Sequence, residues 1–402
     1  MSAGAGRVVL CLNSGSSSLK AACYRIGPGA EERLGTGAVE RIGLDGGLLW
    51  LQEGAGPRRE TPGRFPGHAV AAEALLDALA GSALPPPAAA GHRLVHGGAA
   101  FAAPTRIEGG TLDALHALVP LAPLHLPGAL EAIAAVTHRH PRLPQVACFD
   151  TAFHRRMPER AQRLPLPREW WERGVRRYGF HGLSYEYVLG ALGEAGRGRV
   201  IVAHLGNGAS LAAAAGGEPR LTTMGLTPAG GVMMGTRTGD LDPGVLVYLM
   251  REHGLDAAAL DDLINQHSGL LGVSGTSPDM RTLLERRAAD PCAAEAVAMF
   301  CDAVRRAIGA LAAELGGLDT LVFTGGIGER AAPVRAEICA GLGFLGVALN
   351  AAANARHADT VSAPGAACGV RVIPTNEDLM IARHTHRVVF GVLGGAEPQS
   401  DS

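Results

Sequence analysis

The sequence predicts an α/β protein with two similar domains, and three observations lead to this class. The chain has 402 residues, more than one ordinary hydrophobic core accommodates. Apolar stretches typical of strands alternate with stretches typical of helices. A Gly-rich turn between two apolar strands occurs in residues 7–26 and again in 199–215, which suggests a duplicated domain unless the two hairpins match by chance. We place the domains at 1–150 and 151–383, with a C-terminal helix at 384–402 that joins the first.

The first half of the chain begins with a hairpin and continues with helices. Residues 7–26 read as the strand VVLCL, the small polar turn NSGSSS and the second strand LKAACYRI. Residues 81–90 contain three consecutive prolines and are expected to form a surface loop, whereas 145–150 read as a short buried strand that ends in an acid. The spacing of apolar residues predicts helices at 68–80, 111–119 and 129–139.

The second half repeats the hairpin and then becomes helical. Residues 199–215 read as the strand RVIVAHL, the turn GNGAS and the strand LAAAA. Helices are expected after Leu255, and a strand at 318–323 precedes the turn TGGIGE. The GxGxxG pattern at 341–346 follows a helix instead of opening one, so we interpret it as a helix end and not as a dinucleotide fingerprint. The polar tail at 394–402 is expected to be disordered.

Composition narrows the possible functions before any motif is considered. The chain carries 36 Lys and Arg against 38 Asp and Glu, so we expect no overall basic surface for nucleic acid or an anionic membrane. The longest charge-poor runs, such as residues 200–217, are interrupted by Gly or Asn and do not predict a membrane span. Seven scattered cysteines without a CxxC pair predict no disulfide framework, and most are expected to be buried. A cytoplasmic protein is therefore expected.

The first turn, from Asn13 to Lys20, has the composition of a phosphate-binding loop. Gly15 permits a positive φ, and the serines around it supply hydroxyl and backbone N–H donors in one short segment. Lys20 adds a compact cation and is the only lysine in the chain. A polar hairpin turn without a ligand is the alternative. The P-loop pattern GxxxxGK[ST] is absent from the sequence.

Two further Gly-rich segments are candidates for nucleotide contact. The HLGNG segment, 204–208, ends a strand, and as an ordinary Asn-Gly hairpin it is also explained without a ligand. Paired with the first turn, it could grip a polyphosphate from the opposite side. The TGGIGE segment, 324–329, places three glycines between a strand and a helix, where a flat ring or a phosphate can approach the backbone.

Two arginines lie among glycines, where their side chains have little to pack against. Arg93 follows Gly91-His92 in a strand-like segment, and Arg237 lies in the loop MGTRTGD. Binding of an anion explains such an arginine better than burial of its stem does. The alternative for Arg237 is a salt bridge to Asp240 or Asp242.

Several acids and histidines are weaker candidates when taken alone. Asp150 ends a strand, where acids of α/β proteins often face the ligand crevice. Glu377 comes just before an apolar helix, so a role in its N-terminal cap is the alternative. His125 and His181 lie in mixed loops, where a histidine is more often structural than catalytic. His92 and the histidine four residues later have no HExxH or Cys partner that would indicate zinc.

Taken together, these segments resemble the acetate kinase family, within the superfamily that also holds sugar kinases, actin and the heat-shock ATPases. The similarity covers nearly the whole chain, and the segments follow one another in the order of the family. They are NSGSSSLK, GHRLVHGG, LAPLHLP, CFDTAFH, RRYGFHG, HLGNG, MGLTPAGGVMMGTRTGDLDP, SGLLGVSGTSPDMR, FTGGIGER and IPTNEDLMIA. The resemblance implies two duplicated actin-like ATPase domains of ribonuclease H type, with an active site in the cleft between them. It also implies ATP as a substrate, Mg²⁺ with Mn²⁺ as a possible substitute, and a homodimer.

The resemblance also implies roles for individual residues. Asn13 and Glu377 match the metal positions, Asp150 the active-site acid, and His181 and Arg237 the groups that stabilise the transition state. The substrate carboxylate site is matched by Arg93, and the surroundings of the substrate by Val95, Leu124, His125, Phe180 and Pro228. The ATP-binding segments are matched by Ser16, Ser18, Lys20, His204, Leu205, Gly206, Asn207, Gly208, Asp279, Met280, Arg281, Gly326, Ile327, Gly328, Glu329 and Arg330.

The chain departs from the family pattern at positions beside these residues. Leu126 stands where an Asn usually follows the LAPLH histidine, and Ala99 replaces the Glu after GHRVVHGG. The family segment HGTSH becomes HGLSY, with Leu183 and Tyr185, and the Asn that closes GIGEN becomes Arg330. The Ser and Asp of another segment give way to Pro364-Gly365-Ala366. Contacts to adenine and the rigidity of the substrate loop are affected more than the reaction itself.

The resemblance therefore implies the activity of the acetate kinase family, in which ATP and acetate are reversibly converted into acetyl phosphate and ADP. A propionate kinase or another short-chain carboxylate kinase is the alternative within the family. One methylene in a hydrophobic pocket is worth about 1–3 kcal/mol, so discrimination between the acids is expected to be modest. Val95 favours a small pocket. An alternative of another class is a non-catalytic nucleotide-binding protein, which loss of Arg93, Asp150 or Arg237 would have favoured.

Overall fold

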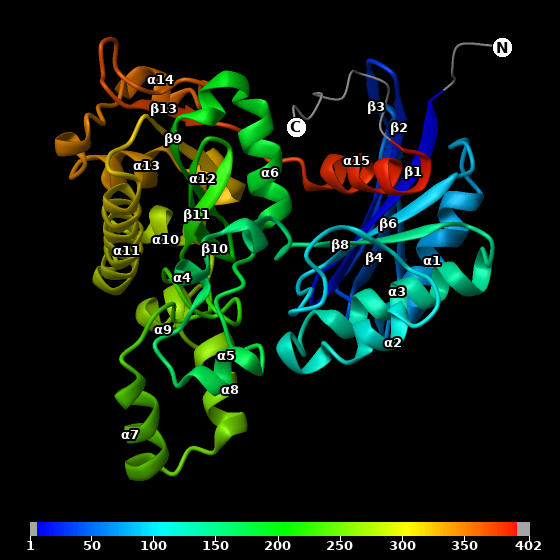
Figure 1. Cartoon of the computed structure of the whole chain (residues 1–402), viewed down its shortest axis with the longest axis horizontal. Helices are drawn as coiled ribbons and strands as arrows, with labels where there is room; N and C mark the ends of the chain where they lie inside the picture. Colours follow the sequence, from blue (N-terminus) through cyan, green and yellow to red (C-terminus); the bar gives the residue numbers. More distant parts are fainter. Residues whose placement is uncertain (1–5, 392–402) are drawn as a thin grey trace, which may run out of the picture. The chain divides into compact units, whose positions relative to one another are not determined.

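The computed structural model describes residues 6–391, which fold into two compact units (Figure 1). Among the described residues, the first unit comprises 6–152 and 376–391, and the second comprises 153–375. A mixed β-sheet forms the centre of each unit. The predicted disordered tail, 394–402, lies outside the described residues. Within residues 6–391, every helix is too short or too polar to cross a membrane.

The first unit is built on an eight-stranded sheet with the order β5-β4-β3-β2-β1-β6-β8-β7. Strands β1 to β5 form an antiparallel meander, whereas β6 and β8 extend the sheet from β1 in parallel. This parallel extension brings the ends of β1, β6 and β8 to the same edge of the sheet. The strands are β1 (Arg7–Ser14), β2 (Ser18–Gly27), β3 (Ala30–Glu40), β4 (Gly47–Glu53), β5 (Arg59–Gly63), β6 (Ala89–Leu94), β7 (Thr105–Arg106) and β8 (Gln145–Phe149).

Helices cover both faces of this sheet. Ala90 of β6 packs in the hydrophobic core that includes α1 and α3, whereas the next residue, Gly91, faces α15. A Cβ atom at Gly91 would lie 2.1 Å from Oγ1 of Thr385 and 2.5 Å from Cγ2 of Ile381, so only glycine allows α15 to pack this closely. The helical elements are α1 (His68–Ala80), α2 (Thr111–His116), the 3-10 turn η1 (Val119–Leu121), α3 (Leu126–Arg139) and α15 (Glu377–Phe390).

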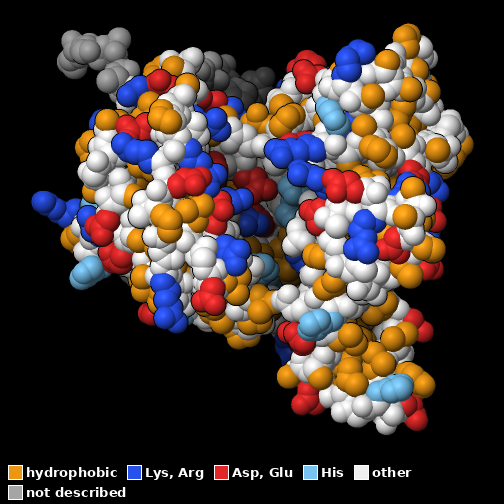
Figure 2. Space-filling model, turned by 180° about the vertical axis from the view of Figure 1, so that it is seen from behind, with side chains coloured by type: hydrophobic (Ala, Val, Ile, Leu, Met, Phe, Trp, Pro, Cys, Tyr) orange, Lys and Arg blue, Asp and Glu red, His pale blue; other side chains and the backbone are white. Residues whose placement is uncertain are grey.

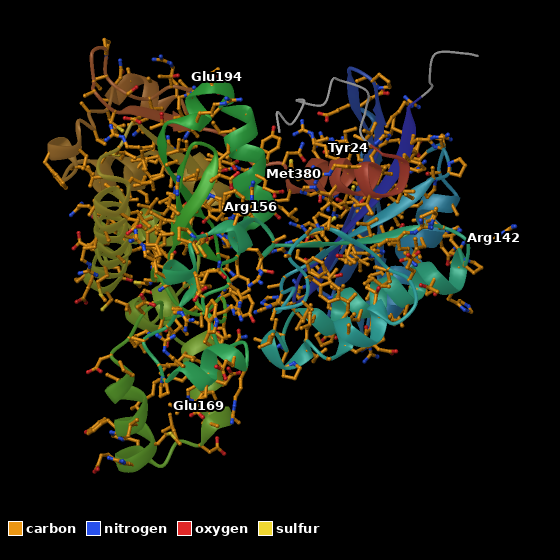
Figure 3. The ribbon with its side chains drawn as sticks, in the orientation of Figure 1. Tyr24, Arg142, Arg156, Glu169, Glu194 and Met380 are labelled. Atoms are coloured by element: carbon orange, nitrogen blue, oxygen red, sulfur yellow. The ribbon has the colours of Figure 1, made fainter. Side chains whose placement is uncertain are left out.

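The predicted C-terminal helix at 384–402 was wrong in its limits. Helix α15 already begins at Glu377, because the side chain of Asn376 accepts a hydrogen bond from the backbone N–H of Leu379 and caps the helix. Tyr24 of β2 donates to the same Asn376 side chain at 3.0 Å, which ties the start of α15 to the sheet. Figure 3 shows the side chains of Tyr24 and Met380 in this region. The chain therefore returns to the first unit at Asn376 and not at 384.

The second unit repeats the plan of the first with fewer strands. Its sheet has the order β11-β10-β9-β12-β13, in which β9 to β11 form an antiparallel meander and β12 and β13 extend the sheet from β9 in parallel. The same arrangement relates β3-β2-β1-β6-β8 in the first unit, so the predicted duplication is confirmed. The strands are β9 (Arg199–Leu205), β10 (Ala209–Ala215), β11 (Glu218–Thr222), β12 (Thr320–Thr324) and β13 (Gly369–Val372).

The helices of the second unit lie around its sheet and in an extension that carries α7 and α8 (Figure 1). The longest, α11, has 25 residues and buries one face that includes Phe300 and Val304. Its helices are α4 (Glu159–Gln162), α5 (Arg168–Glu172), α6 (Gly182–Ala191), α7 (Pro243–His253), α8 (Ala257–Gln266), α9 (Gly269–Ser274), α10 (Met280–Arg286), α11 (Pro291–Leu315), α12 (Gly325–Arg330), α13 (Ala332–Cys339) and α14 (Ala351–Ala355). The 3-10 turns are η2 (Phe153–Arg156), η3 (Gly193–Arg197) and η4 (Gly343–Leu345).

Glycine and proline chemistry explains several differences between the predicted and observed limits of local elements. The helix at 68–80 is confirmed, whereas α3 begins three residues before the predicted 129 because a proline is tolerated in a first helical turn. The predicted turn TGGIGE is itself helix α12, since the positive φ of Gly325 lets the chain enter a helix directly after β12. The GxGxxG segment follows α13 and ends at Gly346 with positive φ, as predicted for a helix end.

Candidate functional site

Three neighbouring strands of the first unit bring polar side chains to one place. Asn13 of β1 lies opposite Lys20 of β2 and opposite Arg93 of β6 in the strand register. Residues directly opposite one another project from the same face of a sheet. Lys20 and Asn13 of one hairpin therefore lie beside Arg93, which is far from them in the sequence, at the end of otherwise apolar strands.

Arg93 is held by a two-pronged ion pair with Asp150, which follows β8. Its Nε donates to Oδ1 of Asp150 at 3.0 Å and its Nη2 donates to Oδ2 at 2.5 Å. Its Nη1 donates to Oδ1 of Asn13 at 3.1 Å. Only 1% of the Asp150 side chain and 16% of the Arg93 side chain are exposed. Burial alone would lower the pKa of Arg93, but the carboxylates of Asp150 and Glu377 outweigh it and the pKa is raised.

The first turn of α15 adds two carboxylates to this cluster. Oε2 of Glu377 lies 3.8 Å from Nε of Arg93. Glu377 is not the N-terminal cap of α15, because Asn376 occupies that position. Burial, together with the neighbouring Glu377, raises the pKa of Asp378 to about 6. The cluster thus contains three carboxylates, Asp150, Glu377 and Asp378, near the cations Arg93, Lys20 and Arg33.

A metal ion fits this donor set if other ligands complete its coordination. Among residues 6–391, no three His, Cys, Asp or Glu side chains form a group that could hold a metal alone. Mg²⁺ usually binds one or two protein oxygens together with waters and substrate phosphates. The amide oxygen of Asn13 and the carboxylate of Glu377 are such oxygens, and both lie around the same guanidinium group.

The predicted phosphate-binding turn, residues 13–20, is held by hydrogen bonds at Gly15 and carries polar groups at its surface. Gly15 donates its N–H to the carbonyl of Ser18 at 2.8 Å, and its own carbonyl contacts Nε2 of His68 at 2.8 Å. Ser16 and Lys20 are exposed and Ser18 is half-buried. Their role in binding ATP stays a prediction.

The residues predicted around the substrate fall into both units. In the first unit Val95 is buried just after β6, His125 occupies the N-cap position of α3, and Leu124 is 48% exposed. In the second unit Phe180 is buried and Pro228 is half-buried. The assignment of these residues to the substrate pocket stays a prediction.

In the second unit His181 is held at the start of α6 by its backbone and its ring. Its φ of 60° is uncommon for a residue other than glycine, and such a conformation persists only where its surroundings fix it. Its Nδ1 lies 2.8 Å from Oγ of Ser210 on β10. Its ring stacks on that of His204, with centroids 4.2 Å apart, and Nδ1 of His204 lies 2.8 Å from Oγ of Ser184.

Arg237 is brought to the same place by a loop between β11 and α7. A Cβ atom at Gly208 would lie 3.0 Å from Nη2 of Arg237 and 3.5 Å from Nε2 of His181, so both groups converge where this glycine leaves space. Nη1 of Arg237 donates to the carbonyl of Pro228 at 2.7 Å. Burial lowers the pKa of Arg237.

The predicted alternative for Arg237, a salt bridge to a nearby acid, is wrong. Asp240 accepts from the backbone N–H of Gly231, and Asp242 caps α7 by accepting from Gly244. Within the described part of the chain, Arg237 forms no ion pair. A half-buried cation without a carboxylate partner favours the binding of an anion.

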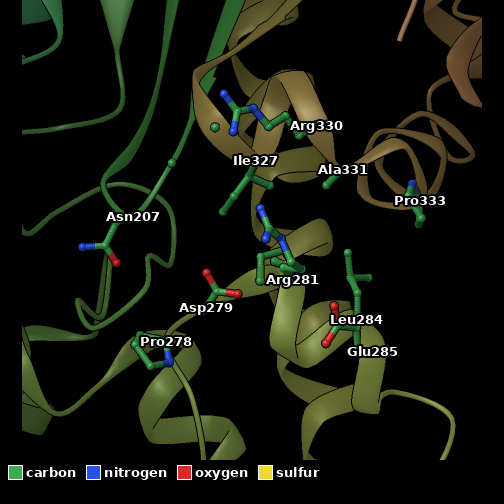
Figure 4. Close-up of a pocket in the computed structure, with 13 residues that line it drawn as sticks. Asn207, Pro278, Asp279, Arg281, Leu284, Glu285, Ile327, Arg330, Ala331 and Pro333 are labelled. Carbon is green, nitrogen blue, oxygen red and sulfur yellow. The ribbon is translucent and has the colours of Figure 1, made fainter. Parts of the chain in front are cut away.

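A cavity of about 640 Å³ lies beside this group of residues, within the second unit (Figure 4). Figure 4 shows Arg281 and Arg330 on either side of Ile327, with Asn207 across the cavity. Its volume is typical of a small-molecule site. Eight residues predicted to bind ATP line it: Gly206, Asn207, Asp279, Met280, Arg281, Gly326, Ile327 and Arg330. Five lining residues were missed by the sequence analysis: Pro278, Leu284, Glu285, Ala331 and Pro333.

Five other residues predicted to bind ATP in this unit do not line this cavity: His204, Leu205, Gly208, Gly328 and Glu329. Oε1 of Glu329 accepts from the N–H groups of Gly325 at 3.0 Å and of Thr375 at 3.3 Å, so this carboxylate braces α12. Leu205 and Gly328 are buried, and His204 lies under His181. Nothing in the motif TGGIGE separates the residue that braces the helix from those that face the cavity.

The departures from the family pattern fall at two kinds of position. Leu126 at the start of α3 and Leu183 in α6 are both buried. At each of these positions a packed apolar side chain stands where the family has a polar one. Ala99 is exposed, and Arg330 is exposed at the rim of the cavity. Arg330 therefore adds a second guanidinium, besides Arg281, where the resemblance leads one to expect an amide.

Comparison with known proteins gives concordant results. Residues 8–383 match the Acetokinase family. An acetate kinase of Rhodopseudomonas palustris is 53% identical over 310 residues, which cover 75% of this chain and 77% of the relative. A propionate kinase of Citrobacter rodentium is 42% identical over 393 residues, covering 95% of this chain and 97% of the relative. The crystal structure of Porphyromonas gingivalis acetate kinase superposes with a TM-score of 0.86 at 39% identity, covering 95% of this chain and all of that one.

Proposed function

Since the chain belongs to the acetokinase family, we propose that it is an acetate kinase that transfers the γ-phosphoryl group of ATP to acetate. A carboxylate oxygen of acetate forms a bond to the γ-phosphorus, and the bond from this phosphorus to the β-phosphate oxygen breaks. ADP leaves with the electron pair, and acetyl phosphate is the product. The same groups serve the reverse transfer from acetyl phosphate to ADP, so the reaction is reversible. The observation that carries the proposal is the convergence of Arg237 and His181 at Gly208.

The proposal needs no general base. Acetate is already ionised near pH 7, so its oxygen is a ready nucleophile. Asp150 has both oxygens engaged by Arg93, which suits it to orient this arginine and not to remove a proton. Arg93 is proposed to bind the carboxylate of the substrate, with Val95, Leu124, His125, Phe180 and Pro228 around its alkyl group.

The main obstacle to this reaction is charge, and the proposed catalytic groups address it. The carboxylate repels the γ-phosphate, and negative charge spreads over three equatorial oxygens during transfer. Arg237 supplies a fixed positive charge and His181 a ring N–H, from a loop and a helix start that already hold them in place. Catalysis then consists of positioning and electrostatic stabilisation.

The nucleotide is proposed to bind in the cavity of the second unit. The glycines at 206 and 326 let it approach the backbone, and Arg281 and Arg330 supply positive charge at the rim. Residues Ser16, Ser18 and Lys20 of the first unit are proposed to contact its phosphates. Mg²⁺, for which Mn²⁺ can substitute, would be held by Asn13 and Glu377 and would neutralise charge on the phosphates. The second unit is therefore the proposed nucleotide domain.

A propionate kinase activity is the second candidate, and the relatives include proteins of both names. Val95 is buried, and a valine at this position favours a small pocket, which supports acetate. Transfer to a series of acids tests both candidates and the non-catalytic alternative at once. With ATP and Mg²⁺, we expect acyl phosphate from acetate at the highest kcat/KM, less from propionate and little from butyrate. No product from any of these acids, with folded protein, would contradict a kinase.

The protein is further proposed to form a homodimer through helix α7. None of the eleven residues of α7 is buried in the single chain, and four large apolar side chains project from it. Figure 2 shows hydrophobic side chains gathered on the extension that carries this helix. They are Val245, Val247, Tyr248 and Met250, and Leu241 lies just before the helix. Such a group of exposed apolar side chains supports association with a second copy, because exposed apolar area of this kind is rare on monomers.

The oligomeric state tests this part of the proposal separately. Light scattering after size exclusion should give twice the chain mass for the wild type and the chain mass for Tyr248→Glu/Met250→Glu. The variant Leu44→Glu, at an exposed leucine of the first unit, should remain dimeric. A monomeric wild type would contradict the dimer.

A cytoplasmic location is proposed because all seven cysteines are free and six are buried, as suits a reducing compartment.

A further inference from the structure

A buried chain of hydrogen-bonding groups lies behind His181. Oη of Tyr185 is 2.5 Å from Oγ of Ser210, which is 2.8 Å from Nδ1 of His181. Tyr185 and Ser210 are both completely buried. His181 and Tyr185 lie one turn apart on α6, where the backbone N–H of Tyr185 donates to the carbonyl of His181. Ser210 on β10 therefore joins two residues of the same helix.

The acidities of the two hydroxyl groups set the direction of this chain. A phenol, with a pKa of about 10, is a stronger donor than the aliphatic hydroxyl of serine. Either oxygen can donate in the short contact between them, and the acidities favour Tyr185 as the donor, which leaves the proton of Ser210 for Nδ1 of His181. A neutral imidazole that accepts at Nδ1 carries its proton on Nε2.

The other ring nitrogen of His181 is the one that faces the proposed site of phosphoryl transfer. Nε2 and the guanidinium of Arg237 both lie against Gly208. An imidazole with the opposite tautomer would present a lone pair there, which repels a phosphoryl oxygen instead of donating to it. The proton on Nε2 thus decides whether His181 helps or opposes the transfer.

We infer that Tyr185, acting through Ser210, is a positioning residue that keeps His181 in the Nε2–H tautomer. Its effect on catalysis rests on the proposed function, whereas its effect on the tautomer does not. Tyr185 is also one of the positions where the chain departs from the family pattern HGTSH. The phenol is therefore this chain's own means of directing the histidine.

The variant Tyr185→Phe tests the inference with little disturbance of packing. It removes one buried oxygen but keeps the ring, which packs against Phe153 and His154 at centroid distances of 6.0 and 5.5 Å. In wild-type protein, ¹⁵N NMR of His181 should show the Nε2–H tautomer, and Tyr185→Phe should show a mixture of both. The assignment comes from the signal that is lost in His181→Gln.

Steady-state kinetics should separate an effect on the orientation of His181 from an effect on substrate binding. Tyr185→Phe should lower kcat on the order of tenfold, about the value of one net hydrogen bond, and change KM for ATP and acetate less than about twofold. Ser210→Ala should do the same, and the double variant should lose no more, because both residues act through one chain. Tyr187→Phe removes a hydroxyl from the same helix outside this chain and should change neither readout.

Each result decides the inference. An unchanged tautomer in Tyr185→Phe overturns it, and so does an unchanged kcat beside an active wild type. Additive losses in the double variant would also contradict it, since they would mean independent structural roles. If wild-type protein phosphorylates no acid, the proposed function fails, and the NMR comparison alone then decides whether Tyr185 directs His181.

Discussion

The two units hold their key arginines in opposite ways. Arg93 of the first unit is locked in a buried ion pair with Asp150, at the end of three strands. Arg237 of the second unit lies in a loop, donates to one backbone carbonyl and has a pKa lowered by burial. The first arginine is neutralised by its own unit, whereas the second carries charge that its own unit does not balance.

Because of this difference, we expect substitutions at the two arginines to affect different properties, namely stability in the first unit and catalysis in the second. Loss of a partner in the first unit leaves a buried charge, so it should weaken the fold as well as substrate binding. Loss of Arg237 removes a group that the fold uses little, so it should spare stability and act on the reaction. The chain allows each unit to be followed separately, since its three tryptophans are Trp50 in the first unit and Trp170 and Trp171 in the second.

The largest expected effect is on stability, from Asp150→Ala. The change leaves Arg93 buried without a carboxylate of comparable closeness, and should lower the free energy of unfolding of the first unit by about 3–5 kcal/mol. Urea denaturation followed by Trp50 fluorescence, in a Trp170→Phe/Trp171→Phe background, measures it. The double replacement Arg93→Met/Asp150→Leu should recover most of the loss. A loss below about 1 kcal/mol would mean that the ion pair does not matter for the fold.

The second prediction concerns turnover. Arg237→Ala should lower kcat by a factor on the order of 10²–10³, as expected for loss of a preorganised charge donor. Unfolding of the second unit, followed by Trp170 and Trp171 with Trp50→Phe, should change by less than about 1 kcal/mol, since one hydrogen bond to a carbonyl is lost. Arg220→Ala, at an exposed arginine of β11, is the matched control. Near-normal turnover of Arg237→Ala would remove this residue from the mechanism.

Buried histidines provide a test in which the two units should behave alike. Burial lowers the pKa of His92 in the first unit and of His154 in the second to about 4. Their neutral forms stabilise the fold fully above the unfolded pKa of about 6.5, and this stability is lost as the pH falls through the folded pKa of about 4. Each should contribute up to about 3 kcal/mol.

The fluorescence reporters measure this loss in each unit. Between pH 6.5 and 4, wild-type protein should lose stability relative to His92→Asn in the first unit and relative to His154→Asn in the second. If the difference in the free energy of unfolding between wild type and variant stays constant over this pH range, these histidines titrate normally.

The smallest expected effect is on the choice of acid. Val95→Ala removes two methyl groups from a buried position and should raise the ratio of kcat/KM for propionate over acetate by about five- to tenfold. Steady-state kinetics with both acids measures the ratio. An unchanged ratio would place the alkyl group of the substrate elsewhere.

The sequence predicted the fold well because the strands are short, strongly apolar and separated by glycine turns. The hairpin around Asn13 and its counterpart around Asn207 identified the duplication, which the strand order confirms. The pairing of Arg93 with Asn13 and Asp150 could not be predicted from spacing, because it depends on the order of β1, β6 and β8. Strands β3 to β5 were not foreseen either.

The candidate site was predicted by type of residue more than by individual role. The motif TGGIGE pointed to the cavity but not to the bracing role of Glu329. Ser210 was missed because it lies in an alanine-rich strand with no recognisable motif, and it acts only where the fold joins it to His181. The exposure of the apolar side chains of α7 could not be predicted, since the sequence of this helix resembles that of a buried helix.

The most direct test of the central claim follows the oxygen atoms of the substrate. Acetate labelled with ¹⁸O in both carboxylate positions is converted with unlabelled ATP, and the products are analysed by ³¹P NMR. If a carboxylate oxygen attacks the γ-phosphorus, the phosphorus of acetyl phosphate carries one ¹⁸O and ADP carries none. Acetyl phosphate without ¹⁸O on its phosphorus, or the absence of acetyl phosphate from folded protein with Mg²⁺, would contradict the account.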